Sequence, residues 1–127
     1  MGAVWEAPVS AIDRSLMPRV PNADRAFIDP RKITHYLLAP NHERGSVKAE
    51  FFRRFGFSIA DWPRLPEAFS DHLRANNYVS SRAHGSGHAY RVTGRLNTPD
   101  GRNPGVVVIW LIRFGESHPR LITAFPD

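Results

Sequence analysis

The last third of the chain decides the fold, because residues 88–126 divide into three strand-like runs separated by turn residues. The runs and turns read HAYRVTGRL (88–96), TPDGRNPG (98–105), VVVIWLIRF (106–114), GESH (115–118) and PRLITAFP (119–126). Pro99, Asp100 and Gly101 are typical of a hairpin turn. The pattern predicts a three-strand antiparallel meander, with the uniformly apolar run in the middle of the sheet.

The polar side chains of this meander are almost all cationic or hydroxylic. Its only carboxylates are Asp100 and Glu116, and both fall in turns. Its basic side chains are His88, Arg91, Arg95, Arg102, Arg113, His118 and Arg120. Basic strands without carboxylates suit an anionic, phosphate-bearing partner better than a divalent metal.

Composition indicates one folded, basic domain. The chain has 127 residues, 42% of them hydrophobic, and a net charge of +5, with a pI near 10.4. This length is enough for one core, and the charge points to anionic partners such as nucleic acid. A soluble basic domain without such a partner fits the composition equally. The absence of cysteine excludes disulfides, thiolate zinc sites and a cysteine nucleophile.

The N-terminal region carries no targeting or membrane signal. No apolar run approaches the roughly 18 residues of a membrane span, and Glu6 stands where a signal peptide would be apolar. We therefore expect a cytoplasmic or injected protein without a membrane partner. Residues 1–22 contain three prolines and few apolar residues, which predicts a flexible arm. Residues 23–127 are expected to form a single domain.

Helical patterns precede the meander. Asp29 followed by Pro30 is a strong helix start, because Asp caps free amides and Pro loses no hydrogen bond at the first position. Helices are predicted to begin there and to cover residues 47–55 and 61–76. The order predicts an α+β fold, with N-terminal helices packed on a C-terminal antiparallel meander sheet of three to four strands.

The segment between the last helix and the meander is harder to interpret. Residues 78–81 are predicted as a short edge strand and RAHGSGH (82–88) as a glycine-rich mobile loop. His84 and His88 have metal-like spacing, but the intervening Gly-Ser-Gly does not favour a helix and no carboxylate ligand is near. No metal site is predicted, and no cofactor-binding glycine loop is present.

Alternation along the last strand singles out Thr123. Strict alternation puts Thr123 on an apolar face and Arg120 on the opposite one. Thr123 is then either an ordinary strand residue or a hydroxyl that holds a phosphate or a sugar. Arg120 reaches the same site only if its side chain wraps around the sheet edge.

A second half-site is predicted before the meander. His42 lies in a predicted loop, and Lys48 lies in the first turn of the second helix. A lysine near a helix N-terminus faces the positive end of the dipole, which is compatible with a phosphate bound there. The alternative is a solvated histidine and a lysine that extends along the surface.

Metal-free cleavage of RNA needs a base for the 2′-hydroxyl, a cation for the phosphate and an acid for the leaving oxygen. His, Lys, Arg, Tyr and Thr supply these groups at neutral pH. The chain has such residues and lacks the clustered carboxylates of two-metal nucleases.

Several stretches together resemble one bacterial family of unknown function. They are PNADRAFIDPRKITHYLL, VKAEFFRRFGF, DWPRL, GRLNTPDGR, VVIWLIRF and PRLITAFP, within residues 21–126. Members of that family occur alone and as C-terminal modules of polymorphic toxins. The helix-then-meander order also resembles the barnase–EndoU–colicin–RelE nuclease superfamily. The resemblance implies a toxin-type, metal-independent endoribonuclease, with RNA as substrate and a small cognate antitoxin or immunity protein as partner.

Carried over by position, the resemblance implies a catalytic set of His42, Lys48, Arg91, Arg120 and Thr123. Lys48 with Arg91 or Arg120 would stabilise the phosphate, His42 would be base or acid, and Thr123 would orient the substrate. The family has a basic residue directly before the lysine, where this chain has a valine. Residues on the strands are predicted to bind substrate, namely Tyr90, Arg95, Trp110 and Arg113.

Two non-catalytic functions remain open. A nucleic-acid-binding module on the same basic face predicts salt-dependent binding without cleavage. A protein-interaction module of a toxin–antitoxin-like pair would use residues 1–22 for docking. The role of Arg91 depends on which face of the sheet the helices cover.

Overall fold

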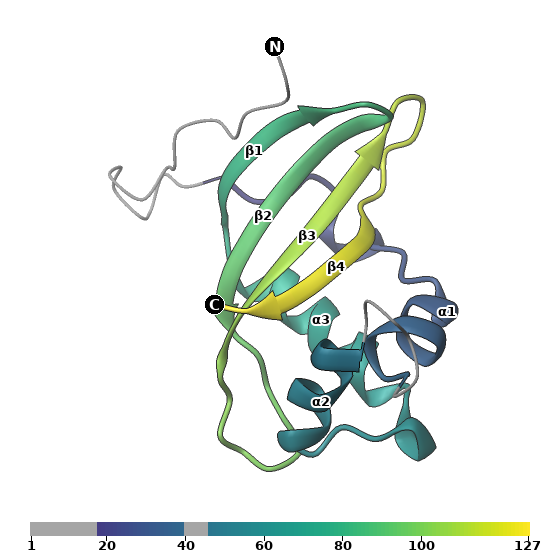
Figure 1. Cartoon of the computed structure of the whole chain (residues 1–127). Coiled ribbons are helices and arrows are strands. Elements are labelled where there is room, and N and C mark those ends of the chain that lie inside the picture. The colour runs from purple at the N-terminus through teal and green to yellow at the C-terminus, as the bar shows by residue number, and fades with distance from the viewer. Residues whose placement is uncertain (1–17, 40–45) are drawn as a thin grey trace.

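The computed structural model describes residues 18–39 and 46–127. In this part of the chain the helices are α1 (Pro30–Lys32), α2 (Ser46–Arg54) and α3 (Arg64–Ala75). The strands are β1 (Tyr78–His84), β2 (Gly87–Arg95), β3 (Gly105–Arg113) and β4 (Arg120–Pro126). The strands form one antiparallel sheet in the order β1-β2-β3-β4, and the helices gather at one end and one side of it (Figure 1).

The expected fold is wrong in its sheet and needs correction. A sheet of three to four strands was predicted, with a short strand at 78–81 and a mobile loop at 82–88. Instead β1 continues to His84, which pairs with Gly87 of β2. Gly85 and Ser86 therefore close a tight hairpin rather than a mobile loop, and a two-residue connection of this kind is the commonest between antiparallel strands. The domain is α+β, with three helices preceding a four-stranded sheet in the described residues.

The first helix begins as its capping residues predict and then changes from an α-helix to a π-helix. The Asp29 carboxylate accepts a hydrogen bond from the Arg31 amide at 3.0 Å, which confirms the predicted start. After Lys32 the helix continues as a π-helical turn, Ile33–Leu37. Such turns are rare in proteins and frequent at functional sites. The predicted plain α-helix is therefore corrected here, and the π-helical turn carries Tyr36.

The other helices nearly match their predicted ranges. α2 ends before Gly56, whose φ of 103° favours glycine. α3 starts three residues later than predicted, because Ile59–Asp61 forms a separate 3-10 turn capped by the Ser58 hydroxyl. None of the described helices is long and apolar enough to cross a bilayer.

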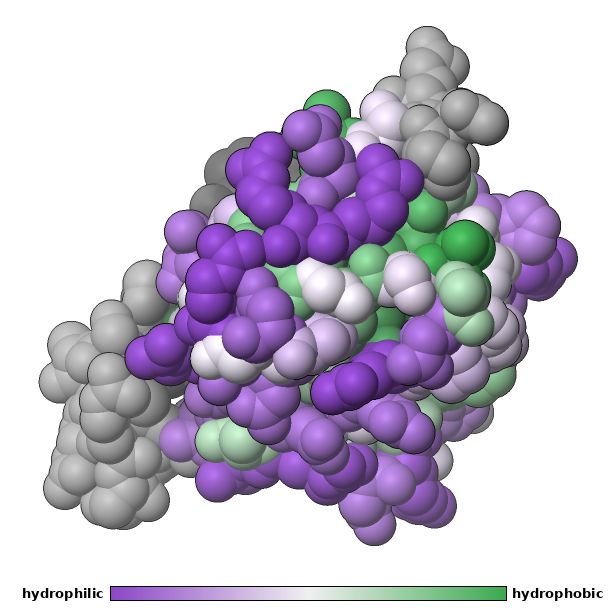
Figure 2. Space-filling view, turned by 90° about the horizontal axis from the view of Figure 1, so that it is seen from below, coloured by the Kyte–Doolittle hydropathy of each residue, from purple (hydrophilic) through white to green (hydrophobic). Residues whose placement is uncertain are grey.

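The helices cover one face of the sheet and form the core there. Trp110 of β3 is fully buried at the centre of that face. Its buried neighbours from both layers are Phe52, Leu65, Phe69, Leu73, Val92, Val106, Val108, Leu121 and Ala124. Each buried valine, leucine or phenylalanine among them contributes about 1.5–3 kcal/mol by leaving water. We call this the helix-covered face. Seen from the helix end, the molecular surface is mostly hydrophilic, with hydrophobic residues in small groups (Figure 2).

A β-bulge decides which side chains of β4 share a face. Ile109 pairs with Thr123, but the next residue, Trp110, pairs with Leu121, so Ile122 is an extra residue. Strict alternation is therefore wrong for this strand. Thr123 lies opposite Ile109, and Arg120 lies opposite Leu111. Both face away from the helix-covered face, on what we call the open face, which also holds Arg91.

Candidate functional site

A groove lies between the α1 and α2 region and the edge strand β4. Its volume is about 780 Å³, within the range of roughly 300–1,000 Å³ of small-molecule sites. It is lined by Asp29, Arg31, Lys32, Tyr36, Lys48, Ile122, Thr123 and Phe125. We call it the β4 groove. It combines side chains from both predicted half-sites.

Three separate elements bring polar groups together in the β4 groove. Tyr36 comes from the π-helical turn, Lys48 from the first turn of α2, and Thr123 from β4 beside the bulge. The Tyr36 hydroxyl and the Thr123 hydroxyl are 3.1 Å apart. The Lys48 ammonium lies 5.6 Å from the centre of the Tyr36 ring, and the Lys32 ammonium lies 5.7 Å from it. The arrangement surrounds one phenol with two cations and a hydroxyl.

The electrostatics of the groove favour negative charge. Burial by itself raises the pKa of Tyr36, but hydrogen bonds with Thr123 and Lys48 and the charges of Lys48 and Lys32 lower it. The net effect is a pKa below the usual value of a phenol. The same cations stabilise any anion that enters the groove.

The carboxylate that lines the groove, Asp29, already forms an ion pair with Arg31. Asp29 receives the Arg31 guanidinium at 2.9 Å, and the hydrogen bonds from Arg31 hold the pKa of Asp29 below its ordinary value. This pair is charge-balanced, so Lys32 and Lys48 give the lining a net positive charge.

A second cavity adjoins the groove on the open face. Its volume is about 270 Å³, and it shares Ile122, Thr123 and Phe125 with the β4 groove. Its other lining residues are Arg82, His84, Ala89, Arg91, Ile109 and Leu111. We call it the strand cavity. The guanidinium carbon of Arg91 lies 5.7 Å from the centre of the Phe125 ring. The structure thus places Arg91 beside the Lys48 and Thr123 groove, across a shared wall.

Arg120 lines neither the β4 groove nor the strand cavity, although the bulge places it on the open face. Its guanidinium donates two hydrogen bonds of 2.8 Å to the Glu116 carboxylate. These bonds and the charge of Arg120 lower the pKa of Glu116 to about 2. Arg120 lines a small cavity of about 140 Å³ with Arg113. Lys48 does not line this cavity, but Asp29, Lys32 and Ile122 line both it and the β4 groove.

The structure does not bring the four predicted substrate-binding residues into the groove. Tyr90 and Trp110 pair with each other on the helix-covered face. Arg95 donates to the carbonyl oxygens of Asn103 and Arg102 and so holds the β2–β3 loop. Arg113 ends β3, beside Arg120. Of the predicted catalytic set, His42 lies outside the described residues.

Sequence reasoning missed two groups of lining residues. Lys32 and Tyr36 are four residues apart on one helical turn, and Lys32 is one of only two lysines in the chain. That spacing was an available signal. His84 lines the strand cavity, whereas His88 lies on the opposite side of the hairpin, against Tyr90. Among the described residues no group of three metal-ligating side chains occurs.

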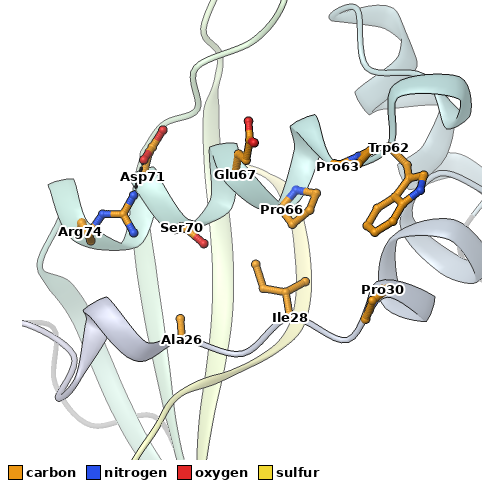
Figure 3. Close-up of a pocket in the computed structure, with 10 residues that line it drawn as sticks. All are labelled: Ala26, Ile28, Pro30, Trp62, Pro63, Pro66, Glu67, Ser70, Asp71 and Arg74. Atoms are coloured by element: carbon orange, nitrogen blue, oxygen red, sulfur yellow. Dashed lines mark hydrogen bonds and ion pairs between the residues drawn. The ribbon is translucent and has the colours of Figure 1, made fainter.

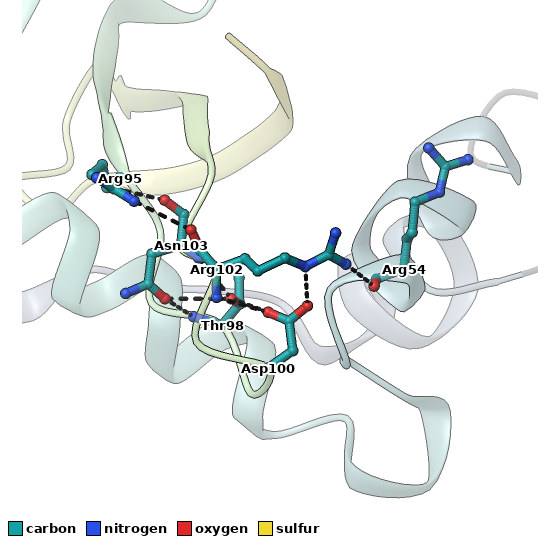
Figure 4. Close-up of polar contacts among 6 residues, drawn as sticks. All are labelled: Arg54, Arg95, Thr98, Asp100, Arg102 and Asn103. Atoms are coloured by element: carbon teal, nitrogen blue, oxygen red, sulfur yellow. Dashed lines mark hydrogen bonds and ion pairs between the residues drawn. The ribbon is translucent and has the colours of Figure 1, made fainter.

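The β2–β3 loop fixes the end of α2 (Figure 4). Arg102 donates to the Asp100 carboxylate at 2.6 Å and to the Arg54 carbonyl at 2.7 Å. Its guanidinium carbon also lies 4.4 Å from the centre of the Phe55 ring. Arg54 is the last residue of α2, where a carbonyl lacks a helical partner and a cation is favourable. The loop thereby holds the helix that carries Lys48.

A further pocket lies between residues 26–30 and α3 (Figure 3). Its volume is about 540 Å³, and its charged side chains are Glu67, Asp71 and Arg74. Asp71 forms an ion pair with Arg74. The pocket lacks a cationic set, so the β4 groove is the better candidate for an anion.

Two comparisons relate the chain to known proteins. Residues 19–127 match a family model described as "Domain of unknown function (DUF6883)". A solved structure described as "Contact-dependent growth inhibition toxin - immunity protein complex from Klebsiella pneumoniae 342" contains a similar chain. The TM-score is 0.61 at 19% identity, covering 79% of this chain and 98% of that chain. At this identity the likeness shows the fold alone. No curated protein matches the chain.

Proposed function

This chain belongs to the DUF6883 family of unknown function, and we propose that it is a toxin-type, metal-independent endoribonuclease. One observation carries the proposal: Tyr36, Lys48 and Thr123 converge in a net cationic groove that adjoins Arg91. The shared fold with a chain of a growth-inhibition toxin–immunity complex supports a toxin-related function.

The proposed reaction is an attack of the RNA 2′-hydroxyl on the adjacent phosphorus. A base removes the 2′-hydroxyl proton, the new O–P bond forms, and the bond to the 5′-oxygen breaks. An acid gives a proton to that 5′-oxygen, so the products are a 2′,3′-cyclic phosphate and a 5′-hydroxyl. The phosphate gains negative charge in the transition state, where fixed cations are most effective.

The residues of the groove suit three of these tasks. Lys48 would offset the charge on the phosphate, with Arg91 approaching from the strand cavity. A phenol keeps its proton at neutral pH and is a donor, so Tyr36 is our proposed acid. Nearby Lys48 and Lys32 would stabilise the phenolate that remains. Thr123 would hold the Tyr36 hydroxyl in place, and His42 remains the predicted base.

A cleavage assay with purified protein tests the proposal. Labelled RNA is incubated in excess EDTA, and the fragment ends are analysed. We expect 2′,3′-cyclic phosphate ends and a loss of roughly 10²–10³-fold in rate for Lys48→Ala, the usual effect of removing one transition-state donor. Arg91→Ala should also lower the rate.

Arg53→Ala is the matched control, because Arg53 is an exposed cation of the same helix α2 and does not line the groove. It should retain full activity. Intact RNA with the wild type, or full activity of Lys48→Ala and Arg91→Ala, would contradict the proposal. Thermal melts of each variant establish that it is folded.

The same assay separates the non-catalytic alternatives. The neighbouring structure contains two kinds of protein, a toxin and an immunity protein, so a binding module is the second candidate. Such a module would bind RNA with a strong salt dependence and leave it uncut, or bind a protein and ignore RNA. As a toxin-type nuclease, this chain would instead have a small immunity protein as its own inhibitor. Suppression of cleavage by a protein encoded beside it tests that partner.

A further inference from the structure

The strand cavity differs in chemistry from the groove that it adjoins. Its floor is apolar, formed by Ala89 and Leu111, which are only 2% and 4% exposed. Its basic side chains are Arg82, His84 and Arg91. Among the described residues, no carboxylate lines it. An apolar floor with a cationic rim suits a flat, uncharged group that is attached to an anion.

The size of the cavity limits what it holds. Its volume of about 270 Å³ lies just below the roughly 300–1,000 Å³ of sites for whole small molecules. One planar ring therefore fits, whereas several stacked rings or a folded peptide do not. Thr123 and Phe125 form a wall between the cavity and the β4 groove, so a molecule that occupies both must turn around this wall.

We infer that the strand cavity binds one unpaired nucleobase of an RNA strand whose phosphate lies in the β4 groove. The inference rests on the proposed function, since it takes the groove to be a phosphate site. Bases in single-stranded RNA are recognised by splaying them out against aromatic rings and arginine planes. The wall residue Phe125 and its partner Arg91 provide both kinds of surface.

A pocket for an unpaired base favours single-stranded RNA over duplex RNA as the substrate. A base held in this cavity is separated from its pairing strand, which costs more energy in a duplex than in a single-stranded loop. Stacking on a single ring is tolerant of sequence. The apolar floor adds contact area for any base without selecting among hydrogen-bonding edges.

A binding comparison tests the inference without depending on catalysis. Affinities of wild-type protein for inorganic phosphate, uridine 3′-monophosphate and adenosine 3′-monophosphate are measured by NMR titration at one ionic strength. We expect the nucleotides to bind at least roughly tenfold more tightly than phosphate, as base stacking provides. Shifts of the Ala89 and Ile109 resonances should accompany nucleotide but not phosphate.

Two filling variants locate the effect. Ala89→Leu fills the cavity from β2 and Ile109→Phe fills it from β3, so one can replace the other if either fails to fold. Both should bind phosphate as the wild type does and lose the nucleotide advantage. Ile59→Phe is the control, because Ile59 is 49% exposed and lies outside the cavity.

The outcomes separate this inference from the proposed function. Phosphate binding without a nucleotide advantage overturns the base pocket, and so does an advantage that survives in both filled variants. Binding of neither ligand overturns the pocket and the phosphate groove together. A nucleotide advantage that the filled variants lose supports the pocket, even if the protein leaves RNA uncut and the proposed function fails.

Discussion

The helix-covered face and the open face of the sheet are built from the same strands but carry different chemistry. On the helix-covered face, Trp110 and its neighbours are buried against the helices. On the open face, Arg91, Thr123 and Phe125 line cavities. One residue along a strand is enough to move a side chain from one face to the other. The sheet thus places its main core on one face and the candidate site on the other, although Ala89 and Leu111 of the open face are also buried.

The largest expected effect comes from alanine substitutions at two neighbouring positions of β3, one on each face of the sheet. Trp110→Ala should lower the free energy of unfolding by about 3–5 kcal/mol, as expected for a buried aromatic residue. Ile109→Ala, on the open face, should cost much less because Ile109 is partly exposed. Urea denaturation measures both. Equal costs would show that the open face is as important for stability as the core.

Trp110→Phe is the matched control for the first test. The Trp110 indole N–H is buried and has no hydrogen-bond partner among the described residues. Replacing it with phenylalanine removes this N–H and keeps most of the apolar ring. The loss should therefore be well below that of Trp110→Ala.

The second prediction concerns acid sensitivity on the helix-covered face. His72 of α3 donates from Nε2 towards the carbonyl oxygens of Gly94 and Val106, at 3.2 and 3.1 Å. Burial lowers the pKa of His72, and the two carbonyl contacts oppose this only in part. The unfolded protein therefore binds a proton more readily, so stability is complete above about pH 6.5 and falls at lower pH.

Denaturation midpoints between pH 7.5 and 5 measure this effect. Its slope is at most about 1.4 kcal/mol per pH unit, the limit for one proton. His35→Gln should keep the slope because His35 is exposed. A pH-independent stability of the wild type would contradict the prediction.

The third prediction tests the polar contact of the open face. Thr123→Val removes the hydroxyl that lies 3.1 Å from the Tyr36 hydroxyl, so the pKa of Tyr36 should rise towards its usual value. Ultraviolet titration of the tyrosines follows this change. The rate of RNA cleavage should fall roughly tenfold, as for the loss of one hydrogen bond. Thr123→Ser keeps a hydroxyl and should resemble the wild type in both measurements.

The smallest effect is expected at the edge of the open face, where Arg120 is held by Glu116. Arg120→Gln should raise the pKa of Glu116 from about 2 towards 4.5, which carbon-detected NMR titration measures. In the wild type this pair contributes stability that is lost as the pH falls from 4.5 to about 2. An unchanged Glu116 pKa in the variant would show that another cation lowers it.

Local side-chain and backbone chemistry correctly predicted where the first helix starts and where one of the turns lies. The Asp29–Pro30 helix start and the turn at Gly101 follow from side-chain capping and backbone angles of single residues. The hairpin at Gly85 was misread, because glycine marks both mobile loops and tight turns. The bulge at Ile122 left no local signal, since it depends on how β4 pairs with β3.

The sequence predicted which types of residue form the candidate site better than it predicted which individual residues lie there. Lys48, Thr123 and Arg91 lie around one wall of the open face. Tyr36 could not be assigned to the site from the sequence, because a helical spacing does not reveal which end of a ring reaches solvent. Arg120 was expected to be available for phosphate, yet Glu116, only four residues away, holds it.

By itself the sequence determined the order of helices before strands, the apolar run of β3 and the basic, carboxylate-poor character of the strands. These properties depend on residue type and spacing, which need no partner. Only the tertiary structure decided that Thr123 and Arg91 share a face, that Tyr36 and Lys48 lie beside them, and that Glu116 holds the Arg120 guanidinium. The reason is that the direction in which a side chain points depends on strand pairing and on the docking of α2. Both of these join residues that are far apart in the chain.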